Sequence, residues 1–199
     1  MRGKIWGKTW EGRNGSTIEA ATRLTTKKSA MRILNIGPGA RFLWGSSIHP
    51  GGEEFLTATM KTRRFVADLI DSVGRKLPLQ GSAYTTYEPL EIYNAFSKGR
   101  NVELIVVDRS PLGDALRKSS IKHKVTFIQD DITNIVIEKG VDLLFGINVH
   151  NIDKLIEINS TALRGATIVC QKLPIEAEKR ARLEVLEEIK GNRIYQLKK

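Results

Sequence analysis

The sequence predicts an α/β fold: a doubly wound, mostly parallel sheet of six to seven strands with helices on both faces. Two observations support this. Short apolar runs, rather than alternating ones, recur along the chain, as expected for parallel strands covered on both faces. Stretches with helical periodicity separate these runs, which favours right-handed crossovers and an open sheet. The expected strands are 32–36, 102–108, 124–129, 141–146, 166–171 and 193–197.

The intervening segments are expected to be helical. On the segment 53–75, Val66, Leu69, Ile70 and Val73 form an apolar stripe, and the segment 175–190 has a similar stripe at Leu183, Leu186 and Ile189. The expected helices are 17–28, 53–75, 89–98, 112–119, 153–163 and 175–190.

The composition limits the class of protein. With 199 residues, 41% hydrophobic and 27% charged, the chain is expected to form one soluble domain. No apolar stretch reaches the roughly 20 residues of a membrane span and no secretory signal is evident, so a cytoplasmic location is expected. The single cysteine, Cys170, and three scattered histidines offer no metal-ligand pattern, so no metal site is predicted.

The net charge of +10 favours a polyanionic partner, RNA among them. Residues 1–32 contain eight basic side chains against two acidic ones, and Trp6 and Trp10 lie between them. Such an arm could contact phosphates and stack on bases. A solvated basic tail whose tryptophans pack on the domain is the alternative interpretation. We expect residues 1–30 to form a basic arm or helix that precedes a domain at 31–199.

Candidate site residues follow the expected strands, because ligands of open α/β sheets bind beyond the carboxyl ends of the strands. The first strand ends in "NIGPGA", where Gly37 and Gly39 let the backbone pass close to a ligand. The second ends at Asp108, suited to accept both hydroxyls of a ribose or to cap the next helix. The third precedes Asp130 and Asp131. One of these carboxylates could accept a hydrogen bond from the exocyclic amine of an adenine; alternatively, both are solvated or cap a helix.

The fourth strand is followed by Gly146, Ile147, Asn148 and His150. Asn148 could orient a substrate, and His150 could act as a base or cap the next helix.

Together these strand ends resemble the class I methyltransferases that use S-adenosylmethionine, over about residues 31–172. The resemblance implies a Rossmann-like fold and S-adenosylmethionine as the cofactor. It assigns the glycine-rich motif to Asn35, Gly37, Gly39 and Ala40. The implied cofactor-binding residues in the later loops are Asp108 with Arg109, Asp131 with Ile132, and Ile147.

Three departures from the family pattern stand out. Asn35 replaces the usual acid, and Arg41 stands where a third glycine is expected. Asp108 lies 73 residues after Asn35, whereas a βαβ unit needs only about 30. An insertion at about 45–88 is therefore predicted to lie over the cofactor pocket, with His49, Tyr84 and Tyr87 as candidates for substrate contact. After the helix expected at 175–190 only one short strand remains, so the sheet is expected to stop one strand early.

Methyl transfer to an unidentified acceptor is the function that this resemblance implies. The basic arm favours RNA as that acceptor. Candidates for a catalytic role are Asn148, His150, Tyr84 and Tyr87. A non-catalytic Rossmann-like binding module is the alternative. A nicotinamide dehydrogenase is less favoured, because Phe42 occupies the third glycine position of Gly-x-Gly-x-x-Gly.

Overall fold

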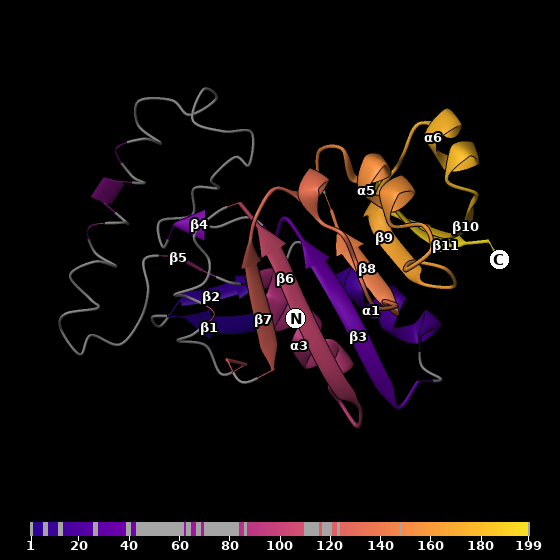
Figure 1. The fold of residues 1–199 in the computed structure, drawn as a ribbon. Helices are drawn as coiled ribbons and strands as arrows, with labels where there is room; N and C mark the ends of the chain where they lie inside the picture. The colour runs from indigo at the N-terminus through magenta and orange to yellow at the C-terminus, as the bar shows by residue number, and fades with distance from the viewer. Residues whose placement is uncertain are drawn as a thin grey trace.

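A computed structural model describes residues 2–5, 8–11, 14–25, 28–38, 41–42, 62, 65–66, 69, 84–85, 87–109, 116, 121–122, 124–147 and 149–198. Its centre is a seven-stranded sheet with the strand order β10-β11-β9-β8-β3-β6-β7 (Figure 1). The strands are β3 (Ala30–Ile36), β6 (Asn101–Asp108), β7 (Val125–Gln129), β8 (Leu143–Gly146), β9 (Thr167–Gln171), β10 (Leu183–Ile189) and β11 (Asn192–Leu197).

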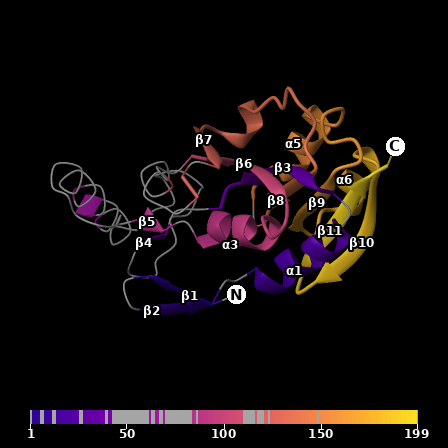
Figure 2. The ribbon, with the colours of Figure 1, turned by 90° about the horizontal axis from the view of Figure 1, so that it is seen from below.

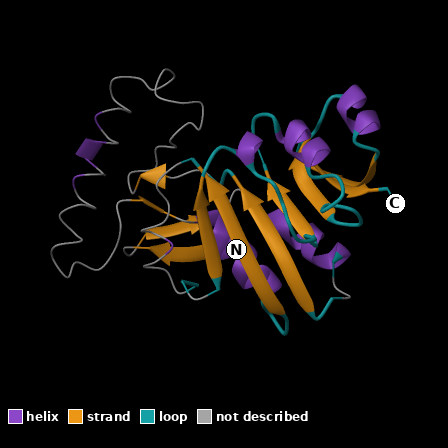
Figure 3. Ribbon diagram, viewed as in Figure 1, coloured by secondary structure: helices purple, strands orange, loops and turns teal. Residues whose placement is uncertain are grey.

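The predicted fold class is confirmed, and so are all six predicted strands to within two residues. Strands β7, β6, β3, β8 and β9 are parallel neighbours. Strand β11 is antiparallel to both β9 and β10. The mixed sheet thus ends in an antiparallel pair at one edge (Figure 3).

Helices cover both faces of the sheet (Figure 2). One face carries α1 (Gly15–Leu24) and α3 (Tyr87–Phe96), whose buried residues Ile18, Ile92 and Phe96 pack with alternate residues of β3, β6 and β8. The other face carries the 3-10 helix η2 (Ile132–Asn134), α5 (Ile152–Ile158) and α6 (Ile175–Arg180). The two apolar layers hold the strands in register, which fixes where the strand ends lie.

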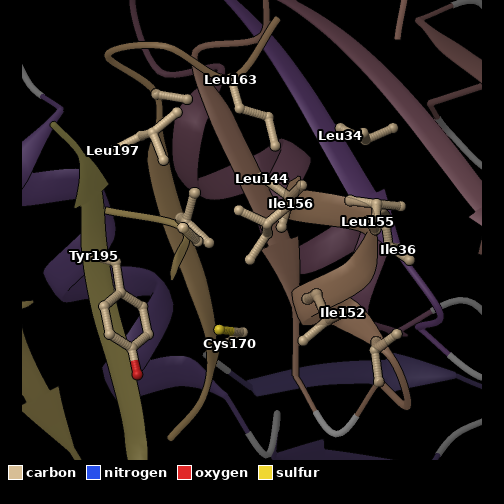
Figure 4. Packing of buried hydrophobic residues seen from close by; sticks show 14 of the residues in the cluster. Leu34, Ile36, Leu144, Ile152, Leu155, Ile156, Leu163, Cys170, Tyr195 and Leu197 are labelled. Atoms are coloured by element: carbon tan, nitrogen blue, oxygen red, sulfur yellow. The ribbon is translucent and has the colours of Figure 1, made fainter. Parts of the chain in front are cut away.

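Figure 4 shows the layer under α5 and α6, in which Leu144, Ile152, Leu155 and Cys170 pack closely. Tyr195 of β11 is fully buried there. Its hydroxyl donates to Glu178 Oε1 over 2.7 Å and accepts from the Leu173 backbone nitrogen over 3.1 Å. This buried tyrosine therefore ties the antiparallel end of the sheet to α6.

The helix predicted at 175–190 is wrong over its second half. Helix α6 ends at Arg180, and Arg182 takes a left-handed backbone conformation with φ +53°, as helices commonly do just after their end. The chain continues as β10 and returns as β11 through Lys190 and Gly191, both at positive φ, which fits a two-residue hairpin turn. The prediction that the sheet stops one strand early is therefore also wrong.

The other predicted helices meet the structure to different extents. Helix α1 covers most of the predicted 17–28, α3 matches 89–98 with a shift of two residues, and α5 matches the first part of 153–163. The helices predicted at 53–75 and 112–119 lie largely outside the described residues.

Two short antiparallel strand pairs lie outside the main sheet. Strands β1 (Arg2–Ile5) and β2 (Lys8–Glu11) pair antiparallel within the predicted basic arm. Strands β4 (Arg41–Phe42) and β5 (Tyr84–Thr85) pair antiparallel at the two ends of the predicted insertion. The chain thus leaves the glycine turn after β3 and returns beside it before α3 begins, and the boundaries of arm, insertion and domain stay predictions.

Candidate functional site

The site is built at the carboxyl edge of the sheet, where four parallel strands end side by side. Hydrogen-bonded registers pair Asn35 with Val106 and Phe145, and Asp108 with Gln129. The arrowheads of β3, β6 and β7 meet at one edge in Figure 1. The glycine bend after β3 and the carboxylate that ends β6 are therefore neighbours, as the sequence predicted.

Gly37 makes the bend that follows β3. Its φ is +56°, a conformation that L side chains rarely adopt. Its backbone nitrogen donates to the Val107 carbonyl oxygen over 2.8 Å. A Cβ added at Gly37 would lie 3.0 Å from Val149 Cγ2, so the loop after β8 packs directly on this bend. Gly39 and Ala40, the other residues of the predicted glycine-rich motif, lie outside the described residues.

Asn35 is fully buried two residues before the bend. Its amide nitrogen donates to Glu88 Oε1 over 2.8 Å and to the Phe145 carbonyl oxygen over 3.2 Å. These two bonds fix the orientation of the amide, because both partners are acceptors. The Asn35 Oδ1 atom is buried and has no hydrogen-bond partner among the described residues. A buried carbonyl oxygen without a partner is unusual and marks a place where a donor would be accommodated.

Glu88 was not predicted as a site residue. It lies in the first turn of α3 and also accepts a bond of 2.6 Å from Asn14 Nδ2, just before α1. Burial raises the pKa of its carboxyl to about 8; the bonds from Asn35 and Asn14 oppose the shift, and the charges of Glu91 and Asp108 add to it. Glu88 therefore lies in a field of negative charge that favours either a proton or a cationic neighbour.

Glu91 follows one turn later on the same inward side of α3 and is 3% exposed. Asp108 is 1% exposed at the end of β6. The structure thus brings three carboxyl groups, Glu88, Glu91 and Asp108, to one region between α3 and the ends of β3 and β6. A helix whose inward stripe combines two acids with Ile92 and Phe96 is a signal that the sequence does contain.

The loop after β7 positions Asp131. Its Oδ1 accepts from the Thr133 backbone nitrogen over 2.9 Å and from the Thr133 hydroxyl over 3.0 Å, so it caps η2. Its other oxygen pairs with Arg109, the residue that follows Asp108. Ile132 packs against the apolar layer on the α5 face. The Arg109–Asp131 pair joins the ends of β6 and β7, and contact with an adenine ring stays a prediction.

The catalytic candidates are only partly described. Ile147 is buried after β8, and Asn148 lies outside the described residues. His150 is exposed, and Asn151, not His150, precedes α5 as its N-cap. The backbone of Tyr84 belongs to β5 and that of Tyr87 to α3, but the structure does not describe their side chains. His49 lies outside the described residues. No catalytic role among these residues is tested by the structure.

Gln171 at the end of β9 supports the loop that carries these candidates. Its side-chain nitrogen donates to the Val149 carbonyl oxygen over 2.7 Å. Since Val149 packs on the Gly37 bend, this bond connects the end of β9 to the glycine turn.

Cys170 offers no nucleophile. It is fully buried within β9, and burial raises the pKa of its thiol to about 12, so the reactive thiolate is not populated near neutral pH. Among the residues that the structure describes, no group of three or more His, Cys, Asp or Glu side chains is arranged to hold a metal ion. Within the same residues no helix has the length and apolar character to cross a membrane.

Comparison with known proteins supports the fold. No protein-family model matches the sequence, and no curated protein matches it. The structure is similar to the ribosomal protein L11 methylase from Lactobacillus delbrueckii, with a TM-score of 0.53, 8% identity, and coverage of 96% of this chain and 81% of that one.

Two further structures are similar at lower scores. The N-methyltransferase NodS from Bradyrhizobium japonicum has a TM-score of 0.49 and 13% identity, with coverage of 92% of this chain and 96% of that one. YjhP from E. coli has a TM-score of 0.44 and 14% identity, with 81% of this chain covered. The chain spans about half of the YjhP chain, 49% of its length.

The fold is therefore that of the class I methyltransferases. After helix α6 the chain forms the antiparallel strand pair β10 and β11, one strand more than the sequence predicted.

Proposed function

We propose that this chain binds S-adenosylmethionine at the carboxyl edge of its sheet and transfers the methyl group to an acceptor. The observation that carries the proposal is the adjacency of the Gly37 bend and the buried Asp108 carboxyl, at the ends of neighbouring strands β3 and β6. Such convergence of loops at one edge of an open sheet is where ligands of these folds bind.

The described residues fit this cofactor in three respects. The Gly37 bend lacks a side chain where the backbone passes under the ligand, and the unpartnered Asn35 Oδ1 can accept a hydrogen bond. The Asp108 carboxyl can accept two ribose hydroxyls. Residues Arg109, Asp131, Ile132 and Ile147 surround the same edge, together with Gly39 and Ala40 by sequence.

S-adenosylmethionine, when bound, supplies an already activated methyl group. The protein then needs chiefly to hold and align the two reactants and to exclude water. The loop after β8, braced by Gln171 and packed on Gly37, is suited to position an acceptor through Asn148 or His150. Tyr84 and Tyr87, which lie near the end of the predicted insertion, are further candidates for acceptor contact.

Isothermal titration of the full chain with S-adenosylmethionine and with NADH tests the proposal. We expect a micromolar dissociation constant for the first and no measurable heat with the second. Binding of NADH alone would instead support a dehydrogenase. No measurable heat with either ligand would support a non-catalytic module that keeps the fold.

For the acceptor we propose RNA, on the strength of the basic residues that the sequence concentrates in positions 1–32. Helix α1 within this segment packs in the core through Ile18 and Ala21, so the test is placed in the β1–β2 hairpin rather than in this helix. Phosphate contacts by this hairpin would make RNA binding steeply dependent on salt.

Replacing Arg2, Lys4 and Lys8 together by glutamine is therefore expected to weaken retention of RNA. The slope of log K against log salt should fall by roughly two units for a single-stranded probe, since each phosphate contact contributes about 0.7. The measurement is filter binding of total cell RNA between low and physiological salt. Substitution of the exposed Lys190 in the β10–β11 turn serves as a charge control. Retention and slope equal to the wild type would remove the support for RNA.

A further inference from the structure

We propose that the Glu88 carboxylate, on helix α3, binds the α-ammonium group at the methionine end of the cofactor, and that Asn35 holds the carboxylate in place. The inference rests on the proposed function and names a residue that the glycine-rich sequence motif does not contain. Its geometric basis is a pair of hydrogen bonds: Asn35 Nδ2 and Asn14 Nδ2 donate to the two Glu88 oxygens over 2.8 and 2.6 Å.

Glu88 lies beside the glycine bend that follows β3. Asn35 and Glu88 are joined directly, and Gly37 follows Asn35 by two residues. Glu88 is also in the first turn of α3, where the partial positive charge of the helix end favours a carboxylate. The carboxylate is thus held beside the strand end where the glycine bend brings the backbone close to a ligand.

The charges around Glu88 favour a cation. Glu88 faces Glu91 on its own helix and Asp108 on β6, while the facing groups on β3 and before α1, Asn35 and Asn14, are neutral amides. Three carboxyl groups in a region withdrawn from water repel one another, and a cation relieves that repulsion.

The Asn35 amide supports the same conclusion without reference to the three carboxyl groups. The Asn35 side chain is fully buried, and its Oδ1 has no hydrogen-bond partner among the described residues. An ammonium group carries several N–H donors and can satisfy this oxygen while it lies close to the Glu88 carboxylate. The same cation therefore accounts for the carboxyl cluster and for the orphaned carbonyl oxygen.

The inference predicts that cofactor binding expels a proton. Because burial holds the pKa of Glu88 near 8, the group is largely protonated at pH 7 without ligand. A bound cation favours the charged carboxylate, so the proton leaves and the affinity rises as the pH increases from about 6 to 7.5, below the pKa of about 8 at which an α-ammonium group loses its own proton. Calorimetry in two buffers of different ionisation enthalpy counts that proton.

The decisive variants are Glu88→Gln and the exchange Asn35→Asp with Glu88→Gln. At pH 7.5, where the α-ammonium group of the ligand is still largely charged, E88Q is expected to bind S-adenosylmethionine roughly tenfold or more weakly, because a partner of the ligand's charge is lost. At pH 7, E88Q should release fewer protons than the wild type. Because both proteins bind the same ligand, the difference between the two proton counts excludes any proton that the ligand itself gains or loses. The N35D/E88Q pair restores a carboxylate two residues before Gly37, so its affinity should recover most of the loss. Glu138→Gln, an exposed acid in the loop before β8, is the control.

The outcomes separate this inference from the proposed function. If the wild type binds S-adenosylmethionine while E88Q, folded by circular dichroism, binds it equally well and releases the same number of protons, the role of Glu88 is overturned and the proposed function stands. If E88Q does not fold, a wild-type affinity that is flat between about pH 6 and 7.5 with no proton release overturns it. If the wild type binds no S-adenosylmethionine at all, the proposed function fails and this inference fails with it.

Discussion

Replacing Asp108 by asparagine is expected to weaken binding of S-adenosylmethionine by at least about 30-fold, corresponding to roughly 2 kcal/mol or more for loss of a buried charged hydrogen-bonding partner. The side chain is 1% exposed and ends β6 directly beside the Gly37 bend. Asparagine keeps the shape of the side chain but offers a ribose one acceptor instead of two oxygens. The dissociation constant from isothermal titration is the quantity to compare.

A matched control lies on the same strand. Glu103 is near the opposite, amino end of β6, where its side chain is 58% exposed and pairs with Arg32 over 3.3 Å. Glu103→Gln should leave the affinity unchanged, because this end of the strand is remote from the glycine bend. Equal affinities of wild type, D108N and E103Q would show that the end of β6 does not hold the cofactor.

The largest loss of stability is expected on replacing Phe145 by alanine. Phe145 is fully buried in β8, between β3 and β9, and packs in the layer that includes Ile92 and Phe96. Truncating such a ring costs about 3–5 kcal/mol of unfolding free energy, through lost burial and the cavity left behind. For a chain of this size the melting temperature should fall by roughly 6–20 °C.

Denaturant titration and thermal melting of the F145A variant measure this loss. Val136→Ala provides the control, since Val136 is 73% exposed in the loop after η2 and its truncation should change the free energy by less than about 0.5 kcal/mol. A loss at Phe145 as small as that at Val136 would mean that the sheet centre is not packed as described.

The parallel part of the fold was predictable because its strands carry a strong local signal. The run that ends at Asp108 is almost continuously apolar, and its last residues, Val106 and Val107, are buried on the two opposite faces of the sheet. The consequence for function follows from topology alone, since parallel strands present their carboxyl ends at one edge. The order of strands and glycines along the chain was therefore enough to place Gly37 and Asp108 together.

The antiparallel edge was not predictable in the same way. Leu183, Leu186 and Ile189 are spaced as on a helix, and the intervening glutamates favour helix. In the structure a bulge between Val185 and Glu187 shifts the register of the pairing with β11. Leu183 and Ile189 pack in the two opposite layers and Leu186 is exposed, so the helix-like spacing does not form one apolar face. Tertiary pairing with a partner strand outweighs local propensity here.

Glu88 and Glu91 were missed for a related reason. Both lie on a segment whose sequence fits the end of the insertion and a covering helix, and their inward direction depends on how α3 packs on β3 and β6. The hydrogen bond between Glu88 and Asn35 joins residues 53 positions apart. Only the fold shows that the asparagine in the glycine-rich motif has a carboxylate beside it.

A crystal structure of the protein with S-adenosylhomocysteine is the most direct measurement of the central claim. The account predicts that the ribose lies on the Asp108 carboxyl and that the amino-acid end of the ligand lies beside Gly37 and Asn35. A ligand bound with its ribose and amino-acid groups away from the ends of β3 and β6 would contradict it.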